Sequence, residues 1–266
     1  MKRLFPLLLL GGCMQGATVT PGLIVSNNPC IDSVLAEIAD PASVGAISEW
    51  SRDPDSSSAP PDWASRFPAI GSGAEELIAA RPRLVLSGAY ASSGTNRALA
   101  RAGIKVRSFG VPAAIAESEQ QVADIADAIG RSVQGRALAK KMRQAAAPSS
   151  DGRSAIIWTS GGFVAGAGTI QDEMLGRAGF RNASAAYGLQ QWDILPEDTL
   201  VRHPPDVSFM PAKARGEDAR ALALRRRVLA HIGGRTRIVS FPEQLLNCGG
   251  PSVIEAMAIF KSVRSS

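Results

Sequence analysis

The sequence of 266 residues is poor in the residues that usually hold metal ions, since it contains only two histidines and three cysteines. His203 and His231 both fall in segments predicted as helices, away from the ends of the predicted strands. Neither is spaced with a carboxylate or a cysteine as zinc ligands usually are. The sequence therefore argues against a zinc site and against direct binding of a bare metal ion.

Signatures of catalysis are also missing. The sequence has no Gly-x-Ser-x-Gly motif, and neither histidine has an evident nucleophile as a partner. The glycine-rich residues 161–169 could cradle an anion, but they lack the lysine of a phosphate-binding loop and do not fit the dinucleotide fingerprint. We therefore assign no catalytic residue and keep an exported hydrolase or transferase of α/β fold as the alternative function.

The charge and the apolar runs exclude two further classes. The formal net charge is only +5 and the basic residues are scattered, which argues against a nucleic-acid partner. The apolar run after Lys2 and Arg3 is well below the roughly 18 residues of a membrane-spanning helix. It instead predicts an export signal over residues 1–13. Residues 10–13 resemble the lipobox of bacterial lipoproteins, which implies a lipid on Cys13; cleavage further downstream is the alternative.

Behind this signal, predicted strands alternate with predicted helices, which favours an α/β fold with mostly parallel sheets. Residues 49–68 are rich in proline and polar side chains and are predicted to form a surface loop. We expect one lobe over residues 18–112 and another over residues 149–266. The strands are predicted at residues 23–26, 44–48, 84–88, 105–109, 155–160, 206–210 and 237–241.

The segment between the two lobes predicts a helix. Residues 117–147 carry apolar side chains at steps of three and four, with acids early and bases late, which complements the helix dipole. At 1.5 Å per residue such a helix would be about 45 Å long. We therefore predict two Rossmann-like lobes joined by a single long α-helix within residues 113–148.

The two lobes also repeat each other in sequence. Residues 31–35 correspond to residues 171–175, and residues 105–109 correspond to residues 237–241. Glu75 corresponds to Asp198, because each is followed seven residues later by a proline and then by a predicted strand. Three matches in the same order predict two similar lobes.

Five stretches of the chain carry a family resemblance: IVSNNPCIDSVLAEI, AEELIAARPRLVLSG, GAGTIQDEMLGRAGFRNA, EDTLVRHPPDVSFM and NCGGPSVIEA. Together they resemble the periplasmic substrate-binding proteins of the iron-siderophore and vitamin B12 uptake family. The resemblance implies a class III, helical-backbone binding protein without a cofactor. Such a protein captures a ferric siderophore, cobalamin or haem and passes it to an ABC transporter permease in the inner membrane. We expect a monomer that closes little on its ligand.

The same resemblance implies one surface acid per lobe that docks on the permease. Glu75 matches the first-lobe position and Asp198 the second. The family usually has a glutamate in the second lobe, so that Glu197 is the alternative there. The simpler alternative is that these acids only complement the N-termini of short helices.

The ligand site is expected beyond the carboxyl ends of the strands, where open α/β sheets bind ligands. Several aromatic side chains fall there and would stack on a flat ligand such as a corrin, a porphyrin or an aromatic chelator. The predicted ligand-binding residues are Asn28, Cys30, Trp50, Arg52, Tyr90, Trp158, Phe163, Trp192 and Cys248.

With Cys13 assigned to lipid, Cys30 and Cys248 remain, one in a predicted cleft loop of each lobe. In an oxidising compartment they are candidates for a disulfide. They could also present soft thiolates to a ligand or remain two unpaired, unreactive thiols, and the sequence leaves these alternatives open.

Overall fold

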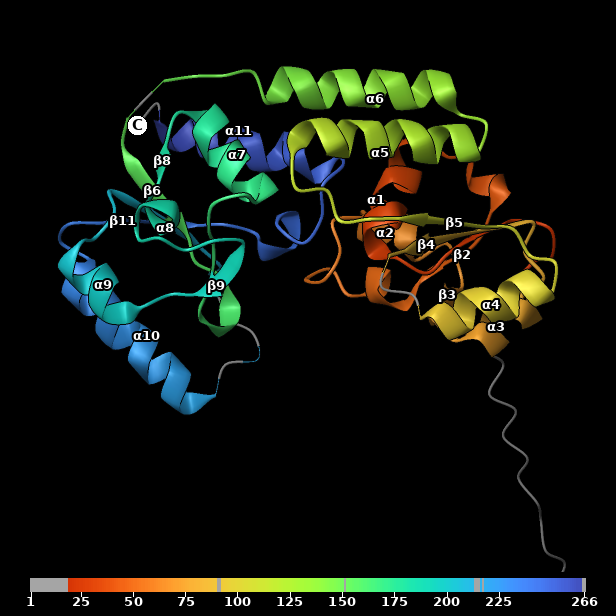
Figure 1. Cartoon of the computed structure of the whole chain (residues 1–266), viewed down its shortest axis with the longest axis horizontal. Coiled ribbons are helices and arrows are strands. Elements are labelled where there is room, and N and C mark those ends of the chain that lie inside the picture. Colours follow the sequence, from red (N-terminus) through yellow and green to blue (C-terminus); the bar gives the residue numbers. More distant parts are fainter. Residues whose placement is uncertain (1–18, 90–91, 151, 213–215, 217, 265–266) are drawn as a thin grey trace, which may run out of the picture.

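The computed structural model describes residues 19–89, 92–150, 152–212, 216 and 218–264, and it forms two α/β lobes beneath a pair of long helices (Figure 1). The predicted export signal, with Cys13, lies outside the described residues. Within the described ranges, no helix has the length and apolar character needed to cross a membrane.

The first lobe is built on a parallel sheet of five strands in the order β3-β2-β1-β4-β5. Every residue of β1 and β2 is buried, as expected for strands that are covered on both faces. The elements are β1 (Ile24–Ser26), α1 (Pro29–Ile38), β2 (Val44–Ser48), α2 (Pro61–Ala64), β3 (Ala69–Ile70), α3 (Ala74–Ala79), β4 (Leu84–Gly88), α4 (Ser93–Arg101) and β5 (Val106–Phe109).

The second lobe has a parallel sheet in the order β11-β10-β6-β8, to which an antiparallel pair, β7 and β9, is added. Strands β1, β2, β4 and β5 thus correspond in order to β6, β8, β10 and β11, and the predicted similarity of the lobes is confirmed. The elements are β6 (Ser154–Ile157), β7 (Phe163–Ala165), α7 (Ile170–Ala178), β8 (Arg181–Asn182), α8 (Ala183–Ala186), β9 (Trp192–Ile194), α9 (Glu197–Arg202), β10 (Val207–Met210), α10 (Ala219–Ile232), β11 (Arg237–Ser240) and α11 (Ser252–Arg264).

The segment predicted as one long helix is two helices, α5 (Ile115–Ala128) and α6 (Ser132–Ala145), which run antiparallel along one side of the molecule (Figure 1). The single continuous helix is wrong because Gly130 has a left-handed φ of +75° and the Arg131 N–H turns back to the Ala126 carbonyl. Gly135 then lets the helices approach, since a Cβ there would lie 2.2 Å from the Ala126 Cβ. A helical hairpin, not a single rod, therefore joins the lobes.

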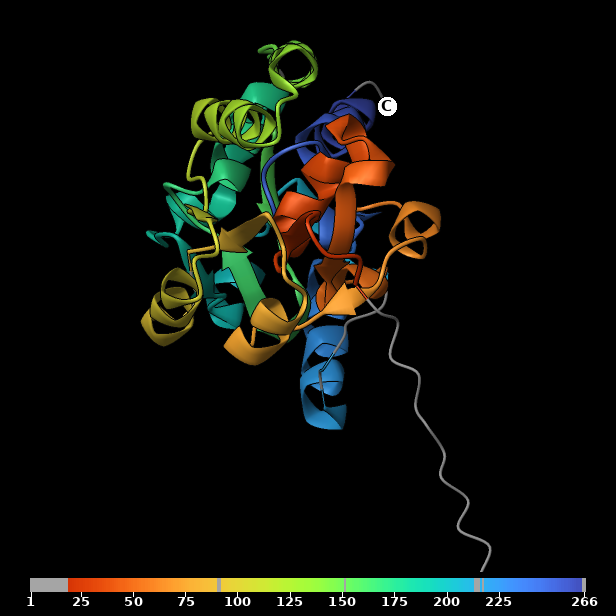
Figure 2. The same ribbon diagram turned by 90° about the vertical axis from the view of Figure 1, so that its right-hand side faces the viewer.

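One apolar cluster runs from the first lobe through the hairpin into the second lobe. Its members include Leu35 of α1, Ile125 of α5, Met142 of α6 and Phe260 of α11, all fully buried. The hairpin packs on α1 of the first lobe and on α7 and α11 of the second (Figures 1 and 2). Because interiors are close-packed, a change in the angle between the lobes would disturb this shared core.

The proline-rich residues 49–68 are more ordered than predicted. Ser48 caps a 3₁₀ turn, η2 (Glu49–Arg52), and α2 follows. Trp63 and Phe67 are buried, with their ring centroids 4.7 Å apart. This segment is therefore part of the first-lobe core and not only a surface loop, because two large aromatic side chains bury their area there.

Candidate functional site

The cleft between the lobes contains a cavity of about 530 Å³, a volume within the usual range of small-molecule sites. The first lobe lines it with Asn28 after β1, Ala89 after β4 and Phe109 at the end of β5. The second lobe adds Thr169 before α7 and Trp192 of β9. The cavity thus lies where the sequence predicts the ligand site, beyond the carboxyl ends of the strands.

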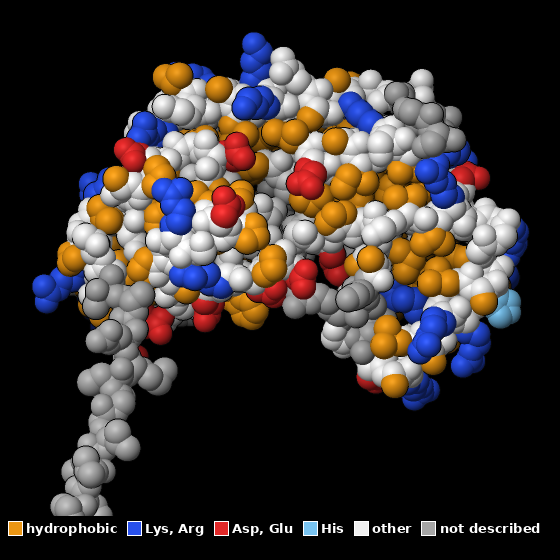
Figure 3. All heavy atoms as spheres, turned by 180° about the vertical axis from the view of Figure 1, so that it is seen from behind, with side chains coloured by type: hydrophobic (Ala, Val, Ile, Leu, Met, Phe, Trp, Pro, Cys, Tyr) orange, Lys and Arg blue, Asp and Glu red, His pale blue; other side chains and the backbone are white. Residues whose placement is uncertain are grey.

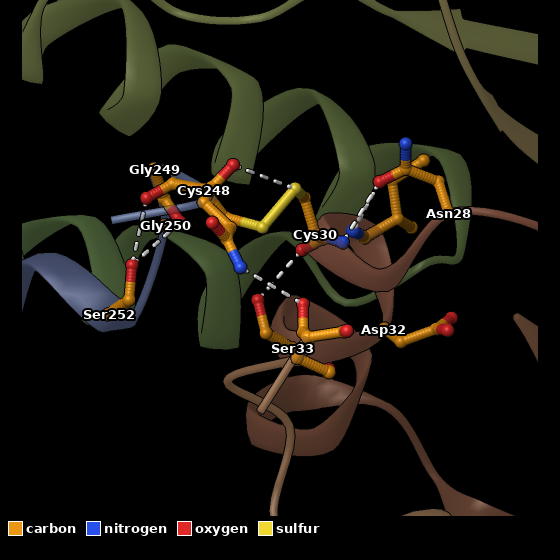
Figure 4. Close-up of a disulfide and its surroundings, with 12 residues drawn as sticks. Asn28, Cys30, Asp32, Ser33, Cys248, Gly249, Gly250 and Ser252 are labelled. Atoms are coloured by element: carbon orange, nitrogen blue, oxygen red, sulfur yellow. Dashed lines mark hydrogen bonds between the residues drawn. A yellow bond between two sulfur atoms is a disulfide. The ribbon is translucent and has the colours of Figure 1, made fainter. Parts of the chain in front are cut away.

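Cys30 and Cys248 form a disulfide (Figure 4). Both residues line the cavity. Cys30 lies in the first turn of α1, where the Asn28 Oδ1 accepts the N–H groups of Cys30 and Ile31 at 2.9 and 3.2 Å. Cys248 lies just before α11, and its Cα is 5.3 Å from that of Cys30. The bond joins the two lobes covalently, and it leaves neither sulfur as a thiolate for a ligand.

The loop that carries Cys248 packs tightly against α5. A Cβ on Gly249 would lie 2.5 Å from the Ser118 Oγ, and the Gly250 N–H donates to that same oxygen at 2.6 Å. Gly250 also has a φ of +78°, which side chains rarely tolerate. The two glycines therefore fix the position of the disulfide and of the neighbouring Asn247.

The second lobe adds an aromatic wall to the cleft. Strands β7 and β9 pair Phe163 with Ile194 and Ala165 with Trp192. Phe163 and Trp192 are 44% and 40% exposed, although large apolar side chains are usually buried. Both line a second cavity of about 350 Å³, which shares Trp192 with the first. Together these side chains offer flat apolar surface to a ligand.

The structure brings five of the nine predicted ligand-binding residues into these cavities. Tyr90 lies outside the described residues. The residues that line the main cavity are Asn28, Cys30, Trp192 and Cys248, and Phe163 lines the second.

Three predicted residues lie elsewhere. Trp50 is 60% exposed and lines neither cavity. Arg52 donates to the Phe67 carbonyl and so holds its own loop. Trp158 is buried in the second lobe beneath the Arg225 guanidinium, which lies 4.4 Å from the centroid of its ring system. Its ring is covered because it packs in an apolar cluster of the second lobe with Leu195 and Val228.

The sequence reasoning predicted Asn28 but missed the other amide side chains of the cleft. Gln121 of α5, Gln171 of α7 and Gln191 next to β9 line the main cavity, together with Asn28 and Asn247. Gln191 lies at a strand boundary, where position could have indicated a ligand contact. Gln121 lies within the segment predicted as one long helix, and nothing in its pattern marks a ligand-facing side.

The cleft is nearly free of charge. Among the described residues that line the two cavities, the only ionisable side chain is Glu243. Its carboxylate oxygens accept the Ser160 N–H at 2.9 Å and the Ser160 hydroxyl at 2.7 Å. Nor does the described part of the chain gather three His, Cys, Asp or Glu residues that could hold a metal ion. The cleft can therefore hold a ligand by shape, apolar contact and amide hydrogen bonds.

A buried carboxyl group supports the first-lobe side of the site. Asp32 of α1 is fully buried, and its Oδ2 accepts the Ser48 N–H at 2.8 Å and the Ser51 hydroxyl at 2.6 Å. Burial raises the pKa of Asp32 to about 7, against hydrogen bonds from Ser26, Ser51 and Ser48 that lower it. Asp32 thereby anchors the turn that comes after β2.

The predicted docking acids lie on α3 and α9, away from the α5–α6 hairpin (Figure 1). Glu75 and Asp198 are exposed, and Asp198 forms an ion pair with Arg202 one turn later. Glu197 is partly buried, and this burial raises its pKa, although Arg227 and Arg225 act in the opposite direction. Both helices directly precede a strand, β4 or β10, as the sequence repeat predicts.

Two similar α/β lobes, a helical connection and a ligand-sized cavity between the lobes define a two-lobed binding protein. The sequence profile of the periplasmic binding protein family matches residues 24–232, and the chain belongs to this family. It is thus a periplasmic substrate-binding protein and not an enzyme, as the sequence predicts. No curated protein sequence matches the chain.

Solved structures share this fold over almost the whole chain. The apo periplasmic haem-binding protein RhuT from Roseiflexus sp. RS-1 has a TM-score of 0.72 at 20% identity, covering 92% of this chain and 100% of its own. The haem-binding protein HutB of Vibrio cholerae has a TM-score of 0.73 at 16% identity, covering 91% and 98%. BhuT, solved with two haems, has a TM-score of 0.70 at 23% identity, covering 91% and 97%. The predicted class III fold with two lobes is confirmed.

Proposed function

We propose that this protein is the substrate-binding component of an ABC importer and that it carries a flat metal chelate, namely a corrinoid, a haem or a ferric siderophore. The observation that supports this best is the cavity between the lobes, with the exposed rings of Phe163 and Trp192 beside it. Flat ring systems stack well on a macrocycle or an aromatic chelator. The similar structures named as haem-binding proteins support the same class of cargo.

The cargo is then delivered to a permease. Glu75 on α3 and Asp198 on α9, with Glu197 beside it, are exposed or half-buried at equivalent places in the two lobes. An acid on each lobe would pair with a basic site on a two-fold permease surface. The protein would act as a monomer, and the shared core and the disulfide favour lobes that keep their angle when the ligand binds. Residues 1–13 would direct export and Cys13 would carry the lipid anchor.

A fluorescence titration tests the site. Haemin, cyanocobalamin and several ferric siderophores are added separately to the protein, and saturable quenching of tryptophan emission is expected with at least one of them. Trp192 lines both cavities, so that Trp192→Ala should weaken the binding that the titration measures. Trp50→Ala, at an exposed position outside both cavities, should leave it unchanged. A folded protein that binds none of these chelates would contradict the proposal.

A further inference from the structure

The segment that holds α10 and β11 is charged with one sign only. Residues 219–242 contain six arginines and no acid, whereas the α5–α6 hairpin, residues 115–145, balances five basic side chains with four acidic ones. Arg225 is buried against Trp158, but Arg220, Arg226 and Arg227 are exposed on α10. Figure 3 shows basic side chains gathered with apolar ones on the lower part of the second lobe. This helix therefore offers positive charge to a partner.

An apolar groove lies beside these arginines, between α9 and α10. Its volume is about 370 Å³, and its apolar walls are Val201 of α9 with Leu224 and Val228 of α10. Leu224 is 39% exposed, although leucine is usually buried. It shares one face of α10 with Arg220 and Arg227, at steps of four and three residues. An apolar side chain between arginines on one helix face is typical of helices that lie at a lipid interface.

Two acids also line the groove, and each has a cation beside it. Asp198 forms an ion pair with Arg202. Burial raises the pKa of Glu197, while the charge of Arg227 acts in the opposite direction. With these acids and the cap Asp218 included, α9 and residues 218–242 together hold seven basic and three acidic side chains. The acids thus reduce the positive charge of this surface without cancelling it.

The surface lies on the side of the molecule where a lipid anchor would attach. In Figures 1 and 2, α10 lies away from the hairpin, on the same side as α3 and α4. The described chain begins there, because Val19 packs against the apolar cluster of Leu77 of α3 and Leu99 of α4. Cys13, the predicted lipid site, comes six residues earlier, and six residues reach at most about 20 Å. A lipid on Cys13 would therefore turn this side toward the membrane.

Resting on the proposed function, we propose that the exposed face of α10 binds the surface of a membrane that contains anionic phospholipids. The guanidinium groups of Arg220, Arg226 and Arg227 bind phosphate groups, for which their planar donors are well suited. Leu224 and the groove beside it take up apolar parts of the lipid, and the arginine stems lie along them. The contact keeps the docking acids of α3 and α9 near the membrane that holds the permease, so that the effective concentration of the two partners rises.

Sedimentation with vesicles tests this contact on the full chain. The vesicles are phosphatidylcholine alone or an equal mixture with phosphatidylglycerol, and the unaltered protein should bind the mixture at least tenfold more tightly. Each basic side chain near an anionic surface strengthens binding about fivefold at low salt. The triple variant Arg220→Gln, Arg226→Gln, Arg227→Gln should therefore lower this preference at least tenfold. Residues 1–18 are the same in every variant, so that any lipid affinity of their own cancels in the comparison.

A matched variant removes the same charge from the opposite side of the molecule. Arg136→Gln, Lys140→Gln, Lys141→Gln changes three exposed side chains of α6 and should keep the preference for the mixed vesicles. An equal fall in both triple variants would show that net charge alone attracts the protein, and it would overturn the proposal. An unchanged preference in the folded α10 variant, checked by circular dichroism, would overturn it as well.

Cargo binding separates this proposal from the proposed function. The three arginines line neither cavity of the cleft, so that the α10 variant should bind its chelate as the unaltered protein does. If the variant kept its preference for the mixed vesicles but lost ligand uptake by cells, α10 would contact the permease and the lipid contact would be wrong. If the folded, unaltered protein bound no chelate, the proposed function would fail, whatever the vesicles showed.

Discussion

The two lobes share their strand order and an aspartate in the first turn of the first helix, yet they use this aspartate differently. In the first lobe, Asp32 of α1 is fully buried and holds Ser48 at the end of β2. In the second lobe, Asp172 of α7 is half-buried and accepts a hydrogen bond from Asn182 at the end of β8. Strands β2 and β8 occupy equivalent places in the two sheets. An equivalent aspartate therefore ties the first helix to the neighbouring strand in both lobes, through a backbone N–H in the first lobe and a side-chain amide in the second, and only the first lobe seals the contact from water.

The two lobes differ more in the segments that they add to this common plan. The first lobe continues after β2 into residues 49–68, which bury Trp63 and Phe67 in the core. The second lobe instead adds the β7–β9 pair, which leaves Phe163 and Trp192 exposed at the cleft. One lobe thus uses its extra aromatic side chains for stability and the other offers them to a ligand. Two lobes with the same strand order can therefore take different roles. The segments inserted between equivalent strands decide which lobe stabilises the fold and which contacts the ligand.

The largest expected effect on stability comes from breaking the disulfide that joins the two lobes. Loss of the Cys30–Cys248 disulfide should lower the free energy of unfolding by about 2–5 kcal/mol, because the bond restrains a very long loop in the unfolded chain. Urea denaturation of the protein, with and without a reductant, measures this. The Cys30→Ala, Cys248→Ala double variant is the control and should not respond to the reductant. Equal midpoints for reduced and oxidised wild-type protein would show that the shared core alone holds the lobes.

The next largest effect is on how stability depends on pH, and it should distinguish Asp32 from Asp172. Burial raises the pKa of Asp32 from 3.8 to about 7, so that the folded state binds more protons than the unfolded state between about pH 4 and pH 7. Stability should therefore fall as the pH rises through this window, by up to about 1.4 kcal/mol per pH unit. Asp32→Asn keeps an acceptor for Ser48 and Ser51 and should flatten this dependence. Thermal melts at a series of pH values test it.

Asp172→Asn is the matched variant in the second lobe. It leaves Asp32 in place and should retain the fall in stability between about pH 4 and pH 7. If Asp172→Asn flattened the profile and Asp32→Asn did not, the assignment of the buried proton to the first lobe would be wrong.

Much of the architecture can be predicted from local sequence signals. The turn at residues 27–29 predicts the start of α1, and the structure shows why, since Asn28 caps the helix and Pro29 begins it. The break at Gly130 was not predictable from the apolar pattern, which continues on both sides of it; only the left-handed φ ends the helix. Strands β7 and β9 have three residues each and exist through pairing across a long sequence separation, which no local pattern reports.

The location of the candidate site could be predicted from the sequence, but only some of the side chains that line it could. Asn28, Trp192 and Cys248, which the strand ends predict as ligand-binding residues, line the cavity, and their binding role stays a prediction. Gln121 and Gln171 were not predictable, because they lie on helices and no local pattern marks the side of the helix that faces the cleft. The side chain of Gln171, for example, reaches the distant Leu246 carbonyl.

The smallest effect on stability is expected from removing the predicted docking acids. These acids compare the two lobes at their outer surface. Glu75 has no ion pair within the described part of the chain, whereas Asp198 shares its charge with Arg202. Exposed pairs of this kind contribute only about 0–1 kcal/mol, so that Glu75→Ala and Asp198→Ala should bind ligand and melt almost as the wild type does. Uptake of the ligand by cells should nevertheless fall in both, and more in Glu75→Ala, because its charge is free to meet a basic site on the permease.

Two further variants sharpen this difference between the lobes. Arg202→Ala frees the Asp198 carboxylate and should leave uptake intact or raise it, which would show that the pair restrains docking in the second lobe. Glu37→Ala removes an exposed acid on α1, outside the two short helices, and should transport normally. If Glu37→Ala reduced uptake as much as Glu75→Ala did, a diffuse negative field would steer the protein to the permease. The acids on α3 and α9 would then serve only to begin their helices.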